Sequence, residues 1–256
     1  MSFSNKSALI TGGTGGIGAA ICEDLLKNGI ENVAVLDMHS EEPAIVNEWR
    51  KKFSNAKIRY FQVDVSSHEQ LEKCYAEFVK EVKSLDIVVN CAGIFNENIY
   101  RKVVEVNLCG VIGSTLIAIE HMRKDKGKGR GGVIVNISSI AGVCPLSYMP
   151  TYGATKHAVV VFTRSLAHGR DKMGIKFLTL CPGGTETPLV DQTFKEPFFF
   201  EMSEDAMKAL SASYVLQSAD KVSEACLEIM REAESGSVWI IQNGKLQEHS
   251  GTPIRI

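Results

Sequence analysis

The feature that most constrains the fold of this chain is a glycine-rich stretch near its start, TGGTGGIG at residues 11–18. A short apolar run, residues 8–11, leads into it, and a helical pattern at residues 19–28 follows it. A second apolar run, residues 33–36, then ends at Asp37. Strand, tight turn, helix and strand in this order make one βαβ unit, which predicts two parallel strands joined by a helix.

The glycine turn and Asp37 together predict a site for a dinucleotide. Glycines in the turn let the backbone approach a pyrophosphate, beside the free N–H groups of the following helix. A carboxylate at the end of the second strand can accept both hydroxyls of an adenine ribose and would repel a 2′-phosphate. No Arg or Lys lies in the turn or directly after Asp37, so NAD is expected rather than NADP. The turn residues expected to contact the cofactor are Gly12, Thr14, Gly16, Ile17 and Gly18.

Beyond Asp37, predicted strands and helices continue to alternate. Apolar runs predict five more strands, at residues 58–65, 87–89, 133–138, 177–180 and 238–241. Amphipathic or apolar stretches predict helices at residues 68–83, 103–119 and 219–233. Such alternation is typical of a parallel sheet covered by helices on both faces. With 256 residues, 45% of them hydrophobic, the chain is expected to form one doubly wound (Rossmann-like) α/β domain over residues 1–256.

Three further segments are expected to line the cofactor site, because each follows a predicted strand. An acidic residue closes the third strand, where it can cap a helix or reach the adenine amino group. The small residues of NCAG, residues 90–93, would let the backbone lie against the cofactor, and PGGTET, residues 182–187, follows the sixth strand. The residues expected to bind here are Asp64, Val65, Asn90, Ala92, Gly93, Pro182, Gly183, Thr185 and Thr187.

The stretch NISSIAGVCPLSYMPTYGATKH, residues 136–157, holds the candidate chemistry. Tyr152 and Lys156 are four apart and share one face of a helix, and Ser139 precedes them across a loop. An ammonium beside a phenol lowers the phenol pKa from its usual value of about 10. A nearby serine hydroxyl can hold a substrate oxygen, so the group is suited to moving a proton on or off an alcohol. Taken alone, the spacing also fits a surface tyrosine beside a solvated lysine.

Charge and cysteine content narrow the classes of function. The net charge is −2, so neither nucleic acid nor an anionic membrane is expected as the main partner. Seven scattered cysteines without a C-x-x-C pair indicate free thiols in a reducing compartment, and no metal site is expected. The start of the chain lacks a signal-peptide pattern, and no stretch approaches the ~20 apolar residues that span a bilayer. The expected location is the cytoplasm, with no membrane insertion.

Six motifs in order resemble the short-chain dehydrogenase/reductase family: TGGTGGIG, Asp37, NCAG, Asn107, the Ser139–Tyr152–Lys156 spacing and PGGTET. The resemblance covers essentially the whole chain. It implies a single doubly wound domain, usually with seven parallel strands, that assembles as a dimer or tetramer. Within the family the chain is similar to the NAD-dependent 15-hydroxyprostaglandin dehydrogenase type and to insect-type alcohol dehydrogenases.

The resemblance also implies a catalytic tetrad and a mechanism. Tyr152, as phenolate, would take the proton of a secondary alcohol while a hydride passes to nicotinamide. Lys156 would lower the pKa of Tyr152 and bind the nicotinamide ribose, and Ser139 would hold the substrate oxygen. Asn107 would hold a water that links Lys156 to solvent, although by itself it fits a satisfied core asparagine equally well. The PGGTET backbone and Thr187 would hold the nicotinamide carboxamide.

Substrate choice is expected to lie in the last third of the chain. Residues 188–214 lose strand character and include three consecutive phenylalanines, which cannot all face inward on a helix. We expect a lid over a lipophilic secondary alcohol; a helix packed on the core is the alternative. Met149 stands where prostaglandin enzymes of the family carry glutamine, which weighs against a prostaglandin substrate. The expected substrate contacts are Ser139, Met149, Tyr152, Phe194, Phe198 and Tyr214.

Assembly and competing functions follow from the same patterns. Helices at residues 103–119 and 152–167 carry more apolar residues than one buried face needs, which predicts a homodimer through them. Residues 247–256 form a polar tail of no clear role.

Besides an NAD-dependent alcohol dehydrogenase, the sequence fits a catalytically silent nucleotide-sensing or scaffold protein. An NADPH-dependent carbonyl reductase is a third reading, against which Asp37 argues; the intact tetrad favours the dehydrogenase.

Overall fold

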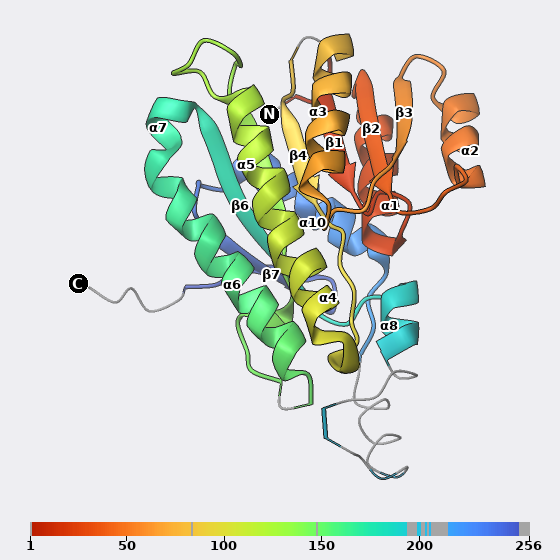
Figure 1. Ribbon diagram of the computed structural model, residues 1–256, viewed down its shortest axis with the longest axis vertical. Coiled ribbons are helices and arrows are strands. Elements are labelled where there is room, and N and C mark those ends of the chain that lie inside the picture. Colours follow the sequence, from red (N-terminus) through yellow and green to blue (C-terminus); the bar gives the residue numbers. More distant parts are fainter. Residues whose placement is uncertain are drawn as a thin grey trace.

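The computed structural model describes residues 2–82, 84–146, 148–193, 199–200, 203, 205 and 215–250. Within these ranges a single sheet of eight strands runs through the molecule in the order β3-β2-β1-β4-β5-β6-β7-β8 (Figure 1). Their bounds are β1 (Ser7–Thr11), β2 (Asn32–Asp37), β3 (Lys57–Gln62), β4 (Ile87–Asn90), β5 (Gly132–Ile137), β6 (Ile175–Pro182), β7 (Val238–Gln242) and β8 (Lys245–Glu248).

The first seven strands are all parallel, which confirms the doubly wound sheet expected from the sequence. Strand β1 lies in the middle, with β2 on one side and β4 on the other. The direction in which the chain adds strands therefore reverses between β1 and β4. In sheets of this kind ligands bind beyond the carboxyl ends of the strands at the reversal point.

The eighth strand departs from the expected polar tail. Gln247 and Glu248 belong to β8, which pairs antiparallel with β7. The hairpin turns at Asn243 and Gly244, whose φ angles of 52° and 69° are the positive values that a two-residue type I′ turn requires. The Asn-Gly pair after an apolar run is the signal that predicts such a hairpin. The last part of the tail, residues 251–256, lies outside the described residues.

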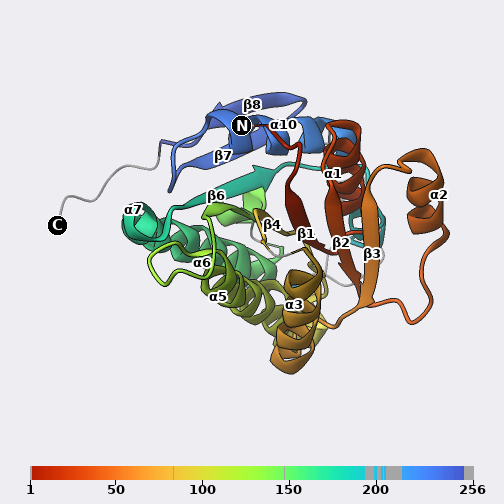
Figure 2. The same cartoon turned by 90° about the horizontal axis from the view of Figure 1, so that it is seen from above.

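Helices cover both faces of the sheet, as the view from above shows (Figure 2). Helices α1, α2 and α10 cover one face, and α3, α5 and α6 cover the other. The sequence patterns do not predict α2. The helix bounds are α1 (Gly16–Lys27), α2 (Ala44–Lys52), α3 (His68–Val82), α4 (Tyr100–Val104), α5 (Val111–Met122), α6 (Pro150–Leu166), α7 (Arg170–Met173), α8 (Pro188–Thr193) and α10 (Ala219–Glu232).

Strands β1 to β6 supply apolar side chains to two cores, one under each helical layer. In β1, Ala8 and Ile10 pack with residues of α1 and α10, whereas Leu9 between them packs with α3 and α5. This division follows from the alternation of side chains along a strand. It explains why the strands read as continuous apolar runs, since burial of each Leu or Ile contributes about 1.5–3 kcal/mol.

One helical stretch is longer than the sequence predicts. It runs from Glu97 to Met122 and contains, between α4 and α5, a π-helical turn at Glu105–Gly110. By length and composition this stretch could cross a membrane, contrary to the expectation that none could; 56% of its most apolar window is buried inside the fold. It packs against α3 and α6, as a core helix of the domain does.

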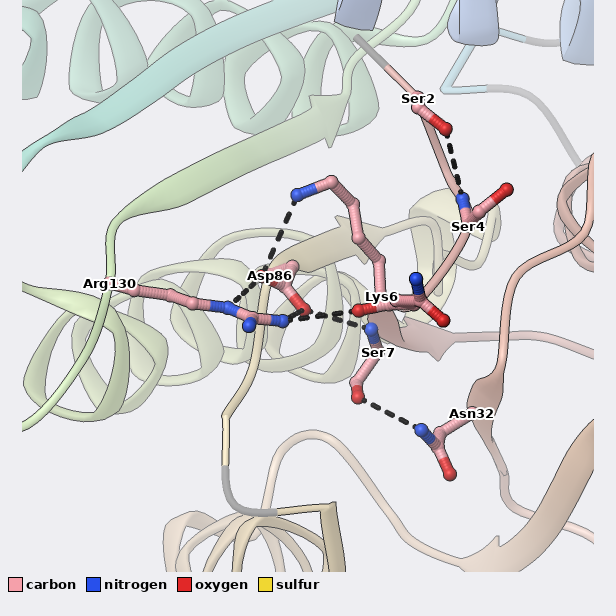
Figure 3. A network of polar contacts seen from close by, with 8 residues as sticks. Ser2, Ser4, Lys6, Ser7, Asn32, Asp86 and Arg130 are labelled. Carbon is pink, nitrogen blue, oxygen red and sulfur yellow. Dashed lines mark hydrogen bonds and ion pairs between the residues drawn. The ribbon is translucent and has the colours of Figure 1, made fainter.

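A polar network ties the amino ends of the strands together (Figure 3). The buried carboxylate of Asp86 accepts hydrogen bonds from the Ser7 N–H (2.9 Å) and from Arg130 Nε and Nη2 (2.7 and 2.9 Å). Lys6 Nζ lies 3.8 Å from the same carboxylate, and Asn32 Nδ2 donates to Ser7 Oγ at 3.3 Å. The network therefore connects β1 and β2 to the segments that lead into β4 and β5.

Candidate active site

A cavity of about 500 Å³ lies at the carboxyl ends of the parallel strands, on the side opposite to the Asp86 network. Its lining brings together most of the site residues that the sequence predicts: Gly12, Gly16, Ile17, Gly18, Asp37, Asp64, Val65, Ala92, Gly93, Ser139, Met149, Tyr152, Lys156, Pro182, Gly183, Thr185 and Thr187. Thr14, Asn90 and Asn107 do not line it. Phe194, Phe198 and Tyr214 lie outside the described residues, as does most of the expected lid at residues 188–214.

Three glycines of the turn, Gly12, Gly16 and Gly18, pass so close to their neighbours that a side chain at these positions is excluded. A Cβ on Gly12 would lie 2.8 Å from the Ala92 Cα, and the φ of Gly12 is 64°. A Cβ on Gly16 would overlap the Thr187 side chain, and one on Gly18 would overlap the Gly12 carbonyl oxygen. Helix α1 starts at Gly16 without a side-chain cap, so its first N–H groups are available to an anionic ligand.

Asp37 stands at the end of β2 and is bonded to the glycine turn. Its Oδ2 accepts hydrogen bonds from Thr14 N (3.0 Å) and Thr14 Oγ1 (2.6 Å), and its Oδ1 accepts one from Met38 N (2.8 Å). Thr14 therefore fixes the carboxylate and is not among the residues that line the cavity, and its direct contact with a cofactor stays a prediction. A carboxylate offers about four acceptor positions, so Asp37 keeps capacity for a ribose hydroxyl.

The Asn90 side chain turns into the core, so its expected contact with a cofactor is left to its backbone and stays a prediction. Its Nδ2 donates to Asn136 Oδ1 (2.8 Å) and to Thr115 Oγ1 (3.0 Å), and its Oδ1 accepts from Ser114 Oγ (2.6 Å). The network continues from Ser114 to the Tyr75 hydroxyl at 2.8 Å. Asn90 thus joins β4 to β5 and α5, and the cavity floor is formed by the residues that follow it.

Asp64 at the far end of the cavity has a partner that the sequence patterns do not reveal. Lys102 Nζ lies 2.9 Å from Asp64 Oδ2, and Ser66 donates to Asp64 Oδ1 from both its N–H and its hydroxyl. Burial alone would raise the pKa of Asp64, but the hydrogen bonds from Ser66 and Lys102 lower it below the ordinary value. Lys102 also lines the cavity. No local sequence pattern predicts the Asp64–Lys102 pair, because the two residues lie in separate elements.

Tyr152 and Lys156 lie on one face of α6, as their spacing predicts, and both face the cavity. Lys156 Nζ is 5.6 Å from the centre of the Tyr152 ring and donates to the Ile137 carbonyl at 3.1 Å. The lysine is only 4% exposed, and this burial lowers its pKa to about 8. A cation held so near to the phenol favours the phenolate form of Tyr152.

The two serines after β5 have different surroundings. Ser138 is buried, and its hydroxyl donates to the Lys156 carbonyl at 2.8 Å. Ser139 lines the cavity, and its Oγ accepts a hydrogen bond from Ala141 N at 3.1 Å, which leaves the hydroxyl hydrogen for another acceptor. This bond caps the short helix Ile140–Gly142. Ser139 is therefore the one of the two that can donate to a substrate oxygen.

Asn107 is fully buried in the π-helical turn and has both ends of its amide paired. Its Nδ2 donates to the Ile94 carbonyl (2.9 Å), and its Oδ1 accepts from the Ile94 N–H (2.8 Å). Gly93, just before Ile94, is flanked by Asn107 and by Lys156 Nζ. Single π-helical turns occur often at functional sites. The direct contact seen here is with backbone, and a water-holding role stays a prediction.

The end of the cavity beside Tyr152 is apolar. Phe95, Ala141 and Met149 form a small buried cluster with Tyr152, Leu146 and Leu189 around it, and the Phe95 ring meets the Tyr152 ring edge-on at 5.7 Å. Sequence reasoning identifies Met149 and Tyr152 but not Phe95, Ala141, Leu146 or Leu189. The charged residues that line the cavity in the described part of the chain are Asp37, Asp64, Lys102 and Lys156.

Gln217 is hydrogen-bonded to the start of the segment that carries α8, next to the cofactor site. Its N–H donates to the Gly184 carbonyl (3.0 Å), and its carbonyl accepts from Glu186 N (2.9 Å). Its side chain donates to the Ile241 carbonyl (2.9 Å) and accepts from Gly244 N (3.0 Å). The stretch of residues 186–217 thus begins and ends at one hydrogen-bonded point next to Thr185.

The fold and the cavity define a dinucleotide-dependent oxidoreductase scaffold with a serine, a tyrosine and a lysine at one end. A family model described as short chain dehydrogenase matches residues 6–197, and the chain belongs to this family.

Individual relatives agree with that assignment. The chain is 34% identical to the NAD(+) 15-hydroxyprostaglandin dehydrogenase of Rattus norvegicus, over 96% of this chain and 94% of that protein. It is 32% identical to alcohol dehydrogenase 1 of Ceratitis cosyra, over 96% and 95% of the two chains. Among solved structures, levodione reductase matches with a TM-score of 0.79 at 25% identity, over 94% of this chain and 98% of that one. ElxO with NADP bound matches with a TM-score of 0.76 at 29% identity, over 93% and 98%.

Proposed function

We propose that this chain oxidises a lipophilic secondary alcohol to a ketone with NAD as the hydride acceptor. The observation that carries the proposal is one continuous cavity. It joins a glycine turn and an acidic strand end to Ser139, Tyr152 and Lys156. The family membership supports an oxidoreductase acting on CH–OH groups.

The residues present fit a dinucleotide along the length of the cavity. The turn at residues 12–18 has no room for a Cβ at Gly12, Gly16 or Gly18 and suits a pyrophosphate, and Asp37 suits the adenine ribose. Asp64 and Val65 would flank the adenine, and Ala92 and Gly93 would form the floor. Lys156 would bind the nicotinamide ribose, and the turn of residues 182–187 would hold the carboxamide. The bound nicotinamide supplies the acceptor for a hydride.

The chain's own residues handle the proton. The alcohol O–H proton would move to the Tyr152 phenolate oxygen as the carbinol carbon gives up its hydride. The Lys156 ammonium stabilises the phenolate before the transfer, and Ser139 donates a hydrogen bond to the substrate oxygen throughout. Apolar side chains around Tyr152 exclude water from the reacting oxygen, which strengthens these interactions.

The apolar surroundings of Tyr152 support a lipophilic substrate. Phe95, Leu146, Met149 and Leu189 surround the reacting end, whereas the charged lining residues Asp37, Asp64 and Lys102 belong to the adenine end. A secondary alcohol with an alkyl or ring body would bury its apolar part here. Similarity to an insect alcohol dehydrogenase favours small alcohols as the second candidate.

The test is a panel of secondary alcohols of increasing chain length, with NADH fluorescence as the readout. We expect kcat/KM to rise about fourfold for each added methylene until the cavity is full, because burial of one methylene is worth about 0.8 kcal/mol. A maximum at the shortest alcohol would favour the small-alcohol enzyme. Tight NAD binding without turnover of any alcohol or ketone would favour the catalytically silent nucleotide-sensing protein.

We also propose a homodimer through α5 and α6, and a cytoplasmic location. Leu116 of α5 and Val161 of α6 are 47% and 65% exposed, more than is usual for side chains of their size, and a copy of the same surface could cover them. The seven cysteines are all free, which suits a reducing compartment. A monomer in light scattering at micromolar concentration would contradict the dimer, and a secreted form would contradict the location.

A further inference from the structure

The start of α6, the helix that carries Tyr152 and Lys156, is not capped by its own neighbours in sequence. Met149 occupies the N-cap position without a side-chain hydrogen bond, and Pro150 has no N–H to donate. Gly153 N donates back to the Met149 carbonyl at 2.9 Å. The N–H groups of Thr151 and Tyr152 therefore need acceptors from elsewhere.

Glu97 supplies both acceptors from a distant part of the chain. Its Oε2 accepts from Thr151 N at 3.0 Å, and its Oε1 accepts from Tyr152 N at 2.9 Å. The residue is only 8% exposed, and none of the ion pairs found among the described residues involves it. A carboxylate at a helix N-terminus is stabilised by the helix dipole and by charge-assisted hydrogen bonds, so the helix start itself balances this buried charge.

The segment that carries Glu97 is also fixed at its other end. Asn107 pairs with both backbone groups of Ile94, and Phe95 rests its ring edge-on against the Tyr152 ring at 5.7 Å. Two residues of the segment 94–97 therefore contact Tyr152: Glu97 accepts from its backbone N–H, and Phe95 packs against its ring. Lys156, one turn further along α6, has separate anchors in the Ile137 carbonyl and the Ser138 hydroxyl.

We propose that Glu97 is a positioning residue for Tyr152, an inference that rests on the proposed function of the site. By binding the first free N–H groups of α6, it fixes where the phenol stands relative to Lys156 and to the cavity floor at Gly93. Loss of Glu97 should displace the first turn of α6, which holds Tyr152, and leave the second turn, which holds Lys156, in place.

The test uses Glu97→Gln and Glu97→Ala in the full chain. Glutamine keeps the size of the side chain but can accept only one of the two hydrogen bonds and carries no charge. We expect kcat to fall about 10-fold for Glu97→Gln and about 100-fold for Glu97→Ala, since a displacement near 1 Å can cost two orders of magnitude. NAD affinity should stay within about twofold, because Lys156 and the glycine turn are unaffected.

Asp86→Asn is the matched control. Asp86 is likewise a buried carboxylate that accepts a backbone N–H, from Ser7, but it lies at the opposite end of the strands (Figure 3). This substitution should lower the melting temperature while kcat at a temperature well below it stays unchanged. If Glu97→Gln keeps the kcat of the parent, or if Asp86→Asn loses kcat to the same extent as Glu97→Gln, Glu97 has no positioning role.

Amide hydrogen exchange separates failure of this inference from failure of the proposed function. Exchange at Thr151 and Tyr152 should become faster in Glu97→Gln and remain unchanged in Asp86→Asn. An unmodified protein that oxidises no alcohol with NAD contradicts the proposed function, whereas the exchange comparison needs no turnover. Unchanged exchange at both amides in Glu97→Gln would overturn the positioning role by itself.

Discussion

The two ends of the parallel strands carry polar groups of similar kinds in opposite circumstances. At the amino ends, Asp86, Arg130 and Ser7 satisfy one another's hydrogen bonds. At the carboxyl ends, Ser139, Tyr152 and Lys156 face a cavity of about 500 Å³, whereas the hollow beside Asp86 and Arg130 is about 350 Å³. Asp86 and its hydrogen-bond donors hold the sheet together, whereas the hydroxyl groups of Ser139 and Tyr152 can bind a substrate oxygen. Substitutions at the amino ends should therefore lower stability, and substitutions at the carboxyl ends should lower turnover.

The largest effect is expected from Tyr152→Phe, which removes one hydroxyl at the carboxyl end. Turnover should fall about 10³-fold or more, because proton transfer by a positioned group contributes up to about 10⁴-fold. NAD affinity, measured by fluorescence titration, should stay within about twofold of the parent. Substantial residual turnover would show that another group takes the proton.

The next effect concerns cofactor choice at Asp37. We expect kcat/KM for NAD to exceed that for NADP at least about a hundredfold at neutral pH, because unpaired like charges cost several kcal/mol. The lysine that lines this end of the cavity, Lys102, is already paired with Asp64. The ratio of the two kcat/KM values is the measurement.

Asp37→Ala combined with Met38→Arg should narrow or reverse that ratio. Met38 is exposed and lines the cavity beside Asp37, so an arginine there can reach a 2′-phosphate. The NADP-bound state of ElxO shows that a related scaffold can hold the phosphorylated cofactor. Equal use of NAD and NADP by the unmodified protein would contradict the role given to Asp37.

Arg130→Ala tests the opposite end of the strands. It removes two hydrogen bonds from the buried Asp86 carboxylate, and Lys6 at 3.8 Å replaces them only in part. We expect the free energy of unfolding to fall by roughly 1–3 kcal/mol, the usual cost of a buried group left underbonded. Denaturant titration measures the loss. A changed kcat/KM in this variant, at a temperature where it is folded, would break the separation between the two ends.

The smallest expected effect is a dependence of the unfolding free energy on pH, through Lys156 at the carboxyl ends. Burial lowers the pKa of Lys156 from 10.5 to about 8, so between these values the unfolded chain binds a proton that the folded chain does not. Stability should therefore rise with pH in this window, by up to about 1.4 kcal/mol for each pH unit. The measurement is the difference in unfolding free energy between the parent and Lys156→Met at pH 8 and pH 9, in which the cysteine titrations cancel. A difference that does not change with pH would show that Lys156 stays protonated.

Local patterns in the sequence were sufficient to predict the parallel sheet. Apolar runs, a glycine turn and helical periodicity are properties of neighbouring residues, and they place β1 to β7 and the long helices to within a few residues; the third strand, expected at residues 58–65, ends at Gln62. The π-helical turn around Asn107 has no such local pattern, because packing decides it. Helix α2 has Val46 and Trp49 on one face after Pro43, and the last hairpin has an Asn-Gly pair, but neither α2 nor β8 is among the elements expected from the sequence.

The site is only partly predictable for a related reason. Motif residues at or just beyond the strand ends, such as Asp37 and Gly93, reach the cavity because all parallel strands end there. Asn90 is also the last residue of its strand, but its side chain points to the α5 face like that of Val88, two residues earlier. Glu97 and Lys102 act through partners on other elements, and a single sequence does not encode such pairings in its spacing.

The hydrogen bonds between Gln217 and the turn of residues 184–186 have a consequence for how the substrate range of this fold could change. Residues 188–216 begin and end beside one hydrogen-bonded point, so a change in their number need not move the strands on either side of them. Thr187, which lies against Gly16 of the glycine turn, stays outside this segment. Doubling the length of a closed loop costs only about 0.6 kcal/mol of chain entropy. In a related or engineered protein, this whole segment could be replaced by another one. The protein would then have a different substrate range, while the cofactor site would fold as before.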